Sequence, residues 1–181
     1  MDERVIMAGF GGQGIMAMGK LLAYAGMLEN KEVTWLPSYG PEMRGGTANC
    51  DVMVSDSMIG SPVISHDATA AIIMNLPSLS KFENEVMPGG KIIINKSLIN
   101  EKTSRTDLDA YYVPVNELAA ELGNAKVSNM VMLGAYIELT KVVEIDSILK
   151  AFLKVFGENK AHLVPLNKEA LLKGAEAVKN A

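Results

Sequence analysis

The feature that most constrains the fold is a glycine-rich turn between an apolar run and a helical pattern. Residues 9–20, GFGGQGIMAMGK, follow directly on the apolar run VIMA at 5–8. Gly9, Gly11 and Gly14 have the Gly-x-Gly-x-x-Gly spacing that joins a strand to a helix in nucleotide-binding α/β domains. There, the first glycine permits a sharp exit from the strand, the second lets a ligand approach the backbone, and the third lets the helix pack closely.

Apolar periodicity extends this turn into a β-α-β unit. Residues 5–9 are typical of a buried strand, and residues 13–29 carry apolar side chains at helical spacing. A second short strand is predicted at 32–36. We expect the connection to be right-handed and the two strands to be parallel.

The rest of the chain continues the α/β pattern and then becomes helical. Segment 58–65 is expected to return as the hairpin partner of a strand at 47–56, and Ser128, Asp146 and Asn167 are predicted helix caps. We therefore predict a Rossmann-like three-layer α/β sandwich, with a mostly parallel sheet, an inserted β-hairpin and a helical C-terminal third, forming one domain over residues 1–181. Further strands are expected at 70–75, 91–95 and 111–115, and a helix at 76–86.

Composition narrows the possible partners. The charged share of 21% is below the usual ~25%, which favours some surface buried against another chain, self-association included. The net charge of −4, without a lysine or arginine block, argues against nucleic acid. The first apolar run is too short for a signal peptide or a membrane span, so we expect a cytoplasmic protein without membrane contact.

Metal and redox chemistry within the chain are not expected. Cys50 is the only cysteine, which rules out an internal disulfide and an iron–sulfur cluster held by this chain alone. No histidine or carboxylate group has metal-ligand spacing, and no catalytic side chain is predicted. His66-Asp67 resembles part of an acid–base pair, but a surface turn is the favoured interpretation.

The glycine turn is predicted to hold a phosphate. Free N–H groups at a helix start suit an anion, and the candidate binding residues there are Gly11, Gly12, Gln13 and Gly14, with Gln13 offering its amide. NAD is disfavoured because the end of the second strand, Trp35 to Ser38, lacks the acidic residue that binds ribose. A turn that only packs remains the alternative.

The loop SYGPEMRGG, residues 38–46, is the second candidate. It follows the second strand, so it lies at the carboxyl edge of the sheet, where open α/β sheets bind ligands. Arg44 has a planar donor fork suited to phosphate or carboxylate. A surface loop in which Glu42 pairs with Arg44 is equally consistent with its composition. The candidate binding residues of the loop are Ser38, Tyr39, Gly40, Glu42, Arg44, Gly45 and Gly46.

Several blocks in one order resemble a known family. GFGGQGIMAMGKLLAYAGM, TWLPSYGPEMRGGTANCDVMVSD, MNLPSL and PGGKIIINKSLI are similar to the gamma subunit of the 2-oxoacid:ferredoxin oxidoreductases. The similarity runs from Arg4 to about Leu139. The form TWLPSYGPEMRGG is most similar to the 2-oxoglutarate and 2-oxoisovalerate members.

The resemblance implies a subunit and not a whole enzyme. Complexes of this family use thiamine diphosphate to decarboxylate a 2-oxoacid, transfer the acyl group to coenzyme A, and pass electrons through iron–sulfur clusters. It implies alpha, beta and ferredoxin-like delta partners that carry the thiamine diphosphate and the clusters, while this chain contributes to coenzyme A binding and subunit packing. A purely structural scaffold subunit and a stand-alone nucleotide-binding oxidoreductase are the alternatives.

Overall fold

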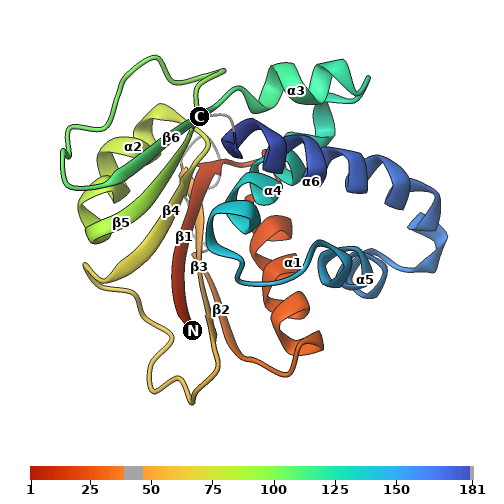
Figure 1. Ribbon diagram of the computed structural model, residues 1–181, viewed down its shortest axis with the longest axis horizontal. Helices are drawn as coiled ribbons and strands as arrows, with labels where there is room; N and C mark the ends of the chain where they lie inside the picture. Colours follow the sequence, from red (N-terminus) through yellow and green to blue (C-terminus); the bar gives the residue numbers. More distant parts are fainter. Residues whose placement is uncertain (39–46, 180–181) are drawn as a thin grey trace.

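The architecture is one six-stranded sheet with helices on both faces (Figure 1). The computed structural model describes residues 1–38 and 47–179. The strand order is β2-β3-β1-β4-β5-β6, in which β1, β4, β5 and β6 are parallel neighbours and β3 is antiparallel to both β1 and β2. The strands are β1 Asp2–Phe10, β2 Glu32–Ser38, β3 Thr47–Ser55, β4 Ala68–Ile73, β5 Val86–Asn95 and β6 Asp109–Val113.

The helices divide unequally between the two faces. The short helix α2 covers one face, and α1, α4, α5 and α6 cover the other (Figure 1). An apolar core lies on each face of the sheet, and β1 contributes to both because its side chains alternate between the two faces. Val5 and Met7 belong to one core, and Ile6 and Ala8 belong to the other. The helices are α1 Ile15–Leu28, α2 Leu76–Phe82, α3 Val115–Glu121, α4 Ser128–Thr140, α5 Ile145–Phe156 and α6 Val164–Lys179, with 3₁₀ turns at Glu83–Glu85, Ala125–Val127 and Glu158–Leu163.

The predicted fold class is confirmed, but the hairpin is a different one. β3 pairs with β2 on one side and with β1 on the other, so the antiparallel insertion is the β2–β3 pair. β1 and β2 run in the same direction but are not neighbours. The expected hairpin partner at 58–65 is wrong, because this segment forms an irregular connection to β4. Pro62, which lacks an N–H donor, and Gly60 both oppose a strand there.

Several helix boundaries also differ from the prediction. The helix expected at 76–86 ends at Phe82, and Val86 instead begins β5. Ser128, Asp146 and Asn167 lie inside their helices and do not cap them. The Asn167 amide Nδ2 donates to the Leu163 carbonyl at 2.8 Å, because α6 starts at Val164, one turn earlier than predicted.

Two glycines allow α4 and α6 to cross in backbone contact. A Cβ atom added to Gly134 would overlap the backbone of Leu171. A Cβ atom added to Gly174 would overlap the carbonyl of Val131. The helical layer that covers β1 therefore depends on small residues at this crossing.

Candidate functional site

The glycine turn has the geometry of an open helix start. β1 ends at Phe10, the N–H of Gln13 donates to the Phe10 carbonyl at 3.2 Å, and α1 begins at Ile15. Gly12 and Gly14 have φ values of +92° and +75°, in the left-handed region that favours glycine. Gly14 is the N-cap residue of α1. The positions of the turn that favour glycine for their backbone conformation are therefore the second and fourth of the sequence GGQG.

Gly9 and Gln13 tie the turn to the neighbouring strand β4. A Cβ atom on Gly9 would lie 2.6 Å from Gln13 Oε1 and 2.8 Å from Met74 Cβ, so Gly9 serves close packing. Gln13 Oε1 accepts from the Phe10 N–H at 2.6 Å, and Gln13 Nε2 donates to the Met74 carbonyl at 3.2 Å. Both ends of this amide are bonded within the protein, so its predicted contact with an anion stays a prediction.

The first turn of α1 leaves backbone donors free. Its first internal bond runs from the Met18 N–H to the Gly14 carbonyl at 2.9 Å, and no side chain caps the helix. Within residues 1–38 and 47–179, the N–H groups of residues 15–17 therefore have no hydrogen-bond partner. A hollow of about 240 Å³ lies beside them, lined by Phe10, Gly11, Gly12, Gly14, Ile15, Met16, Ala17 and Ala48. With no acidic residue in that turn, the positive end of the helix suits an anion.

One further contact at this turn has no signal in the sequence. Asn129, in the first turn of α4, donates from Nδ2 to the Gly14 carbonyl at 3.4 Å. A Cβ atom on Gly14 would overlap the Asn129 side chain. The beginnings of α1 and α4 therefore meet at Gly14, although the two contacting residues are 115 positions apart in the sequence.

The second candidate is only partly placed by the structure. Ser38 ends β2 and pairs with Asn49 of β3, and Thr47 at the start of β3 pairs with Phe10 of β1. The chain therefore leaves the sheet and returns to it at the edge that carries the glycine turn. The other candidates, Tyr39, Gly40, Glu42, Arg44, Gly45 and Gly46, lie outside the described residues.

The remaining titratable candidates have structural surroundings. Burial raises the pKa of Cys50 to about 12, and its thiol donates to the Ile15 carbonyl at 3.7 Å. His66 is exposed, and its backbone N–H donates to a carboxylate oxygen of Glu85 at 3.0 Å, as in a surface turn. No group of three or more possible metal ligands occurs among the residues that the structure describes. In the same part of the chain, no helix has the length and apolar character needed to cross a membrane.

A glycine turn at the carboxyl edge of a mainly parallel sheet defines a Rossmann-like α/β protein. Residues 4–177 match the family model described as pyruvate ferredoxin/flavodoxin oxidoreductase, and the chain belongs to this family. The resemblance inferred from the sequence blocks is thereby confirmed.

Named relatives include subunits of two kinds of 2-oxoacid oxidoreductase. The chain is 35% identical to the ketoisovalerate oxidoreductase subunit VorA of Methanothermobacter thermautotrophicus, over 97% of this chain and 36% of that protein. It is also 35% identical to the 2-oxoglutarate synthase subunit KorC of Methanocaldococcus jannaschii, over 84% of this chain and 83% of that protein. The chain thus spans about a third of the length of the first relative and most of the second.

Solved structures share the fold. The gamma subunit of a keto/oxoacid ferredoxin oxidoreductase from Geobacter sulfurreducens superposes with a TM-score of 0.83 and 27% identity, covering 99% of each chain. The 2-oxoglutarate:ferredoxin oxidoreductase from Magnetococcus marinus gives a TM-score of 0.89 at 24% identity, covering 99% of this chain and 31% of that one. At that identity the second likeness supports the fold alone.

Proposed function

We propose that this chain is the gamma-type subunit of a complex that oxidatively decarboxylates a 2-oxoacid to an acyl-coenzyme A and CO₂, with ferredoxin or a similar protein as electron acceptor. Family membership over residues 4–177 supports this assignment. The full-length match to a gamma subunit from Geobacter sulfurreducens supports the subunit type. The isolated chain is expected to be inactive.

The favoured substrate is 2-oxoglutarate. The 2-oxoglutarate synthase relative aligns over 84% of this chain and 83% of its own length, so the two chains correspond as whole subunits. The second candidate is 2-oxoisovalerate, because the ketoisovalerate relative has the same 35% identity over 97% of this chain. The region similar to this chain makes up about a third of the length of that relative.

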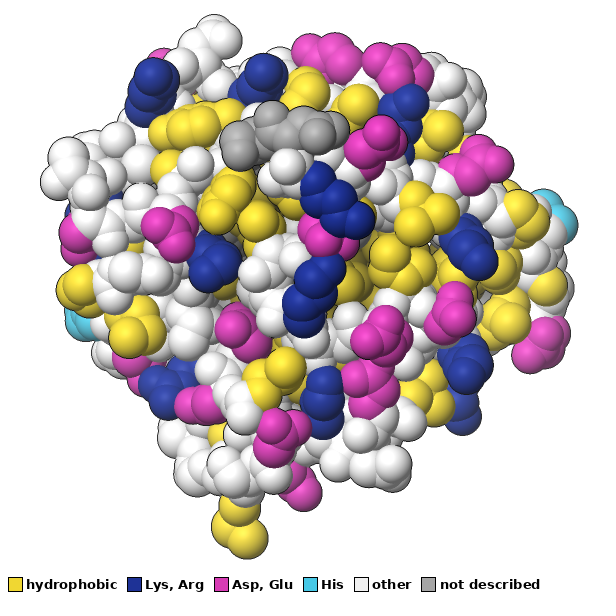
Figure 2. Space-filling view, in the orientation of Figure 1, with side chains coloured by type: hydrophobic (Ala, Val, Ile, Leu, Met, Phe, Trp, Pro, Cys, Tyr) yellow, Lys and Arg dark blue, Asp and Glu magenta, His cyan; other side chains and the backbone are white. Residues whose placement is uncertain are grey.

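Thiamine diphosphate and the iron–sulfur clusters belong, in this proposal, to alpha, beta and ferredoxin-like delta subunits. The single cysteine supports this division, because iron–sulfur clusters are typically held by about four cysteine thiolates. Exposed apolar side chains lie at or shortly after the ends of three neighbouring strands: Phe10 at the end of β1, Leu76 after β4 and Leu98 after β5. Apolar side chains also gather over the helices on the right of Figure 2. Both features suit burial against partner subunits.

The glycine turn is proposed to bind the phosphate-bearing part of coenzyme A. The observation that carries this proposal is the set of free N–H groups at residues 15–17, which border a hollow of about 240 Å³. A Cβ atom added to Gly12 would meet nothing within 4 Å, so the backbone there is open to a ligand. The N–H groups would neutralise a phosphate, and Arg44 would add the cation that the turn lacks. The bound coenzyme supplies the thiol that accepts the acyl group.

Steady-state kinetics of the reassembled complex test this role. We expect Gly12→Ala and Arg44→Ala each to raise the KM for coenzyme A about tenfold or more. The methyl group added at Gly12 would occupy the space of the ligand, and Arg44→Ala would lose one charge-assisted contact. The KM for the 2-oxoacid should be unchanged. Gly89→Ala is the matched control, because Gly89 also has a positive φ, +78°, and faces open space but lies outside the site.

The same preparation separates the alternatives. An unchanged KM for coenzyme A in both variants would favour the scaffold subunit. Nicotinamide-dependent activity of the isolated chain would favour a stand-alone oxidoreductase. Rates with 2-oxoglutarate and with 2-oxoisovalerate distinguish the two substrate candidates.

A further inference from the structure

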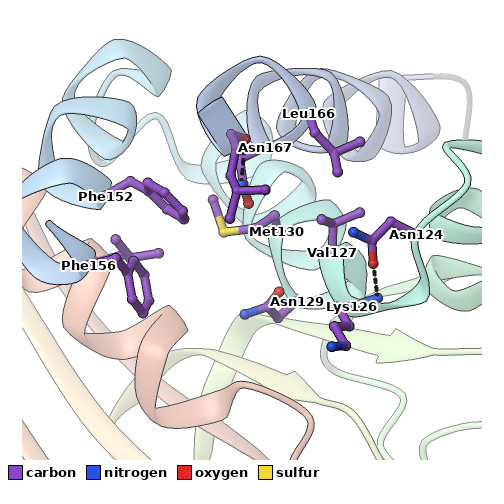
Figure 3. A pocket seen from close by; sticks show the side chains of 11 residues that line it. Asn124, Lys126, Val127, Asn129, Met130, Phe152, Phe156, Leu166 and Asn167 are labelled. Atoms are coloured by element: carbon purple, nitrogen blue, oxygen red, sulfur yellow. Dashed lines mark hydrogen bonds between the residues drawn. The ribbon is translucent and has the colours of Figure 1, made fainter. Parts of the chain in front are cut away.

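A second hollow lies between α1, α4, α5 and α6, and no role has yet been given to it (Figure 3). Its volume of about 210 Å³ is below the ~300–1,000 Å³ of a whole drug-sized ligand site, so it suits one part of a larger ligand. Phe152 and Phe156 form one wall, with ring centroids 4.8 Å apart, and Phe156 is 40% exposed. Met130 and Leu166 add further apolar surface.

Asparagine side chains line the same hollow, and each uses only one end of its amide within the protein. Asn124 Oδ1 accepts from the Lys126 N–H at 3.0 Å, so its Nδ2 donors are unused among the described residues. Asn167 Nδ2 donates to the Leu163 carbonyl, so its Oδ1 acceptor is unused in the same sense. Asn167 is 6% exposed overall, and its Oδ1 is not among the fully buried side-chain atoms without a partner, which fits an acceptor that faces the hollow.

The third asparagine connects this hollow with the glycine turn. Asn129 lines the hollow and donates from Nδ2 to the Gly14 carbonyl at 3.4 Å. Its Oδ1 acceptor has no partner in the described part of the chain. Asn129 lines one hollow and Gly14 lines the other, so this hydrogen bond joins the walls of the two hollows.

We propose that this hollow, hereafter the asparagine pocket, binds the adenine ring of an adenine nucleotide. Adenine presents an amino donor beside a ring-nitrogen acceptor, the edge that an asparagine amide pairs with. The unused Asn167 acceptor would receive the amino group, and the unused Asn124 donor would bind the ring nitrogen. Phe156 offers a face for stacking, and Lys126 at the rim offers a cation to a phosphate. An apolar side chain from a partner would leave these amide ends unpaired.

Two sources share this chemistry: the adenosine end of coenzyme A, and a free adenine nucleotide such as ADP. If the source is coenzyme A, the inference rests on the proposed function, with the diphosphate at the start of α1 and the thiol arm directed outward. If the source is ADP, the pocket senses nucleotide independently of catalysis. The experiment below separates these cases.

The chain carries its own reporters for the test. Met130, 2% exposed, lines the asparagine pocket, Met16 lines the hollow at the glycine turn, and Met58, 90% exposed, lies on the 56–67 connection. With ¹³C-methyl methionine in the full chain, we expect ADP to shift the Met130 resonance. Coenzyme A should shift both Met130 and Met16, whereas pantetheine and inosine diphosphate should leave Met130 unmoved. Met58 should not respond to any of them.

A matched pair of variants tests the base edge. Asn124→Asp keeps an oxygen that accepts from the Lys126 N–H, so the fold should be retained, but it removes the amide donor and adds one negative charge. We expect its Kd for ADP to rise about tenfold, the loss of one hydrogen bond in a partly buried site. Asn84→Asp makes the same exchange at an exposed position of the 3₁₀ turn Glu83–Glu85 and should leave the Kd unchanged.

The outcomes distinguish this inference from the proposed function. If coenzyme A shifts Met16 but no adenine nucleotide shifts Met130, the pocket assignment is overturned and the phosphate role of the glycine turn stands. If ADP shifts Met130 while coenzyme A leaves Met16 unmoved, the adenine pocket is supported and the coenzyme A role fails. The pocket assignment is overturned if ADP and inosine diphosphate shift the Met130 resonance equally. It is also overturned if Asn124→Asp and Asn84→Asp have the same Kd for ADP.

Discussion

The contact between Gly14 and Asn129 allows a quantitative test of how the start of α1 is held. The proposed perturbation is Gly14→Ala, alone and combined with Asn129→Ala. Gly14 has a φ of +75°, and a Cβ atom placed there would overlap the Asn129 side chain. The structure thus assigns two separate costs to one methyl group: backbone strain and steric overlap.

The magnitudes follow from these two costs. Strain of a non-glycine residue in the left-handed region is about 1–2 kcal/mol, and overlap with a packed side chain adds about 1–3 kcal/mol. We therefore expect Gly14→Ala to lower the free energy of unfolding by about 3 kcal/mol. Asn129→Ala alone loses one long hydrogen bond, about 0.5–1 kcal/mol. The double variant retains the strain but not the overlap, so it should lose only about 2–2.5 kcal/mol.

Urea denaturation of the four proteins measures this cycle. The double variant should be more stable than Gly14→Ala alone, with a coupling of about 1–2 kcal/mol, whereas independent sites add within about 0.5 kcal/mol. Costs that simply add would refute the steric contact between α1 and α4. In the complex, the KM for coenzyme A should rise for Gly14→Ala, since the free N–H groups of α1 would be displaced.

Three further predictions concern other parts of the chain. Gly134→Ala should lower the free energy of unfolding by about 3 kcal/mol or more, because the added carbon overlaps the Leu171 backbone. In the same urea titration, Gly60→Ala should change it by less than about 0.5 kcal/mol, because a Cβ atom on Gly60 meets no atom within 4 Å. Burial raises the pKa of Asp51 to about 6 from 3.8, so the ionised carboxylate lowers the stability of the fold above pH 6 but not below pH 4. After discounting for partial exposure, we expect Asp51→Asn to raise the free energy of unfolding by about 1–2 kcal/mol at pH 7.5 and by almost nothing at pH 4. Cys50, buried with a pKa of about 12, should not react with an aromatic disulfide reagent at pH 8 until urea unfolds the chain; fast reaction of the folded chain would contradict its burial.

Local pattern predicted the elements of the first β-α-β unit, because both signals there are short-range. The apolar run before Gly9 and the helical spacing after Gly14 need no knowledge of distant residues. The position of β3 was not predictable in this way. Alternation along 47–56 indicates a half-buried strand, but its neighbours are decided by pairing with β1, more than 40 residues earlier in the chain.

The candidate site divides in the same way. The glycine spacing predicted an open turn, but the sign of φ at Gly12 depends on the path that the backbone takes. The contact of Asn129 with Gly14 had no signal in the sequence, because it joins the starts of two helices distant in the chain. The strand predicted at 58–65 was wrong because the prediction relied on the apolar residues of this segment. Gly60 and Pro62, which both disfavour a strand, were the residues that argued against it.

The insertion of β3 has a consequence for function that a plain parallel arrangement would not have. In a parallel arrangement of β1 and β2, the segment after β2 would lead away into a crossover connection. Here, β3 returns between β1 and β2, and its backbone at Thr47 pairs with Phe10, immediately before the glycine turn. Ser38 and Thr47, the described residues on either side of segment 39–46, therefore both lie at the edge that carries the free N–H groups of α1. A parallel neighbour would leave the end of β2 at the same edge, but only the antiparallel β3 also returns the chain to that edge at Thr47.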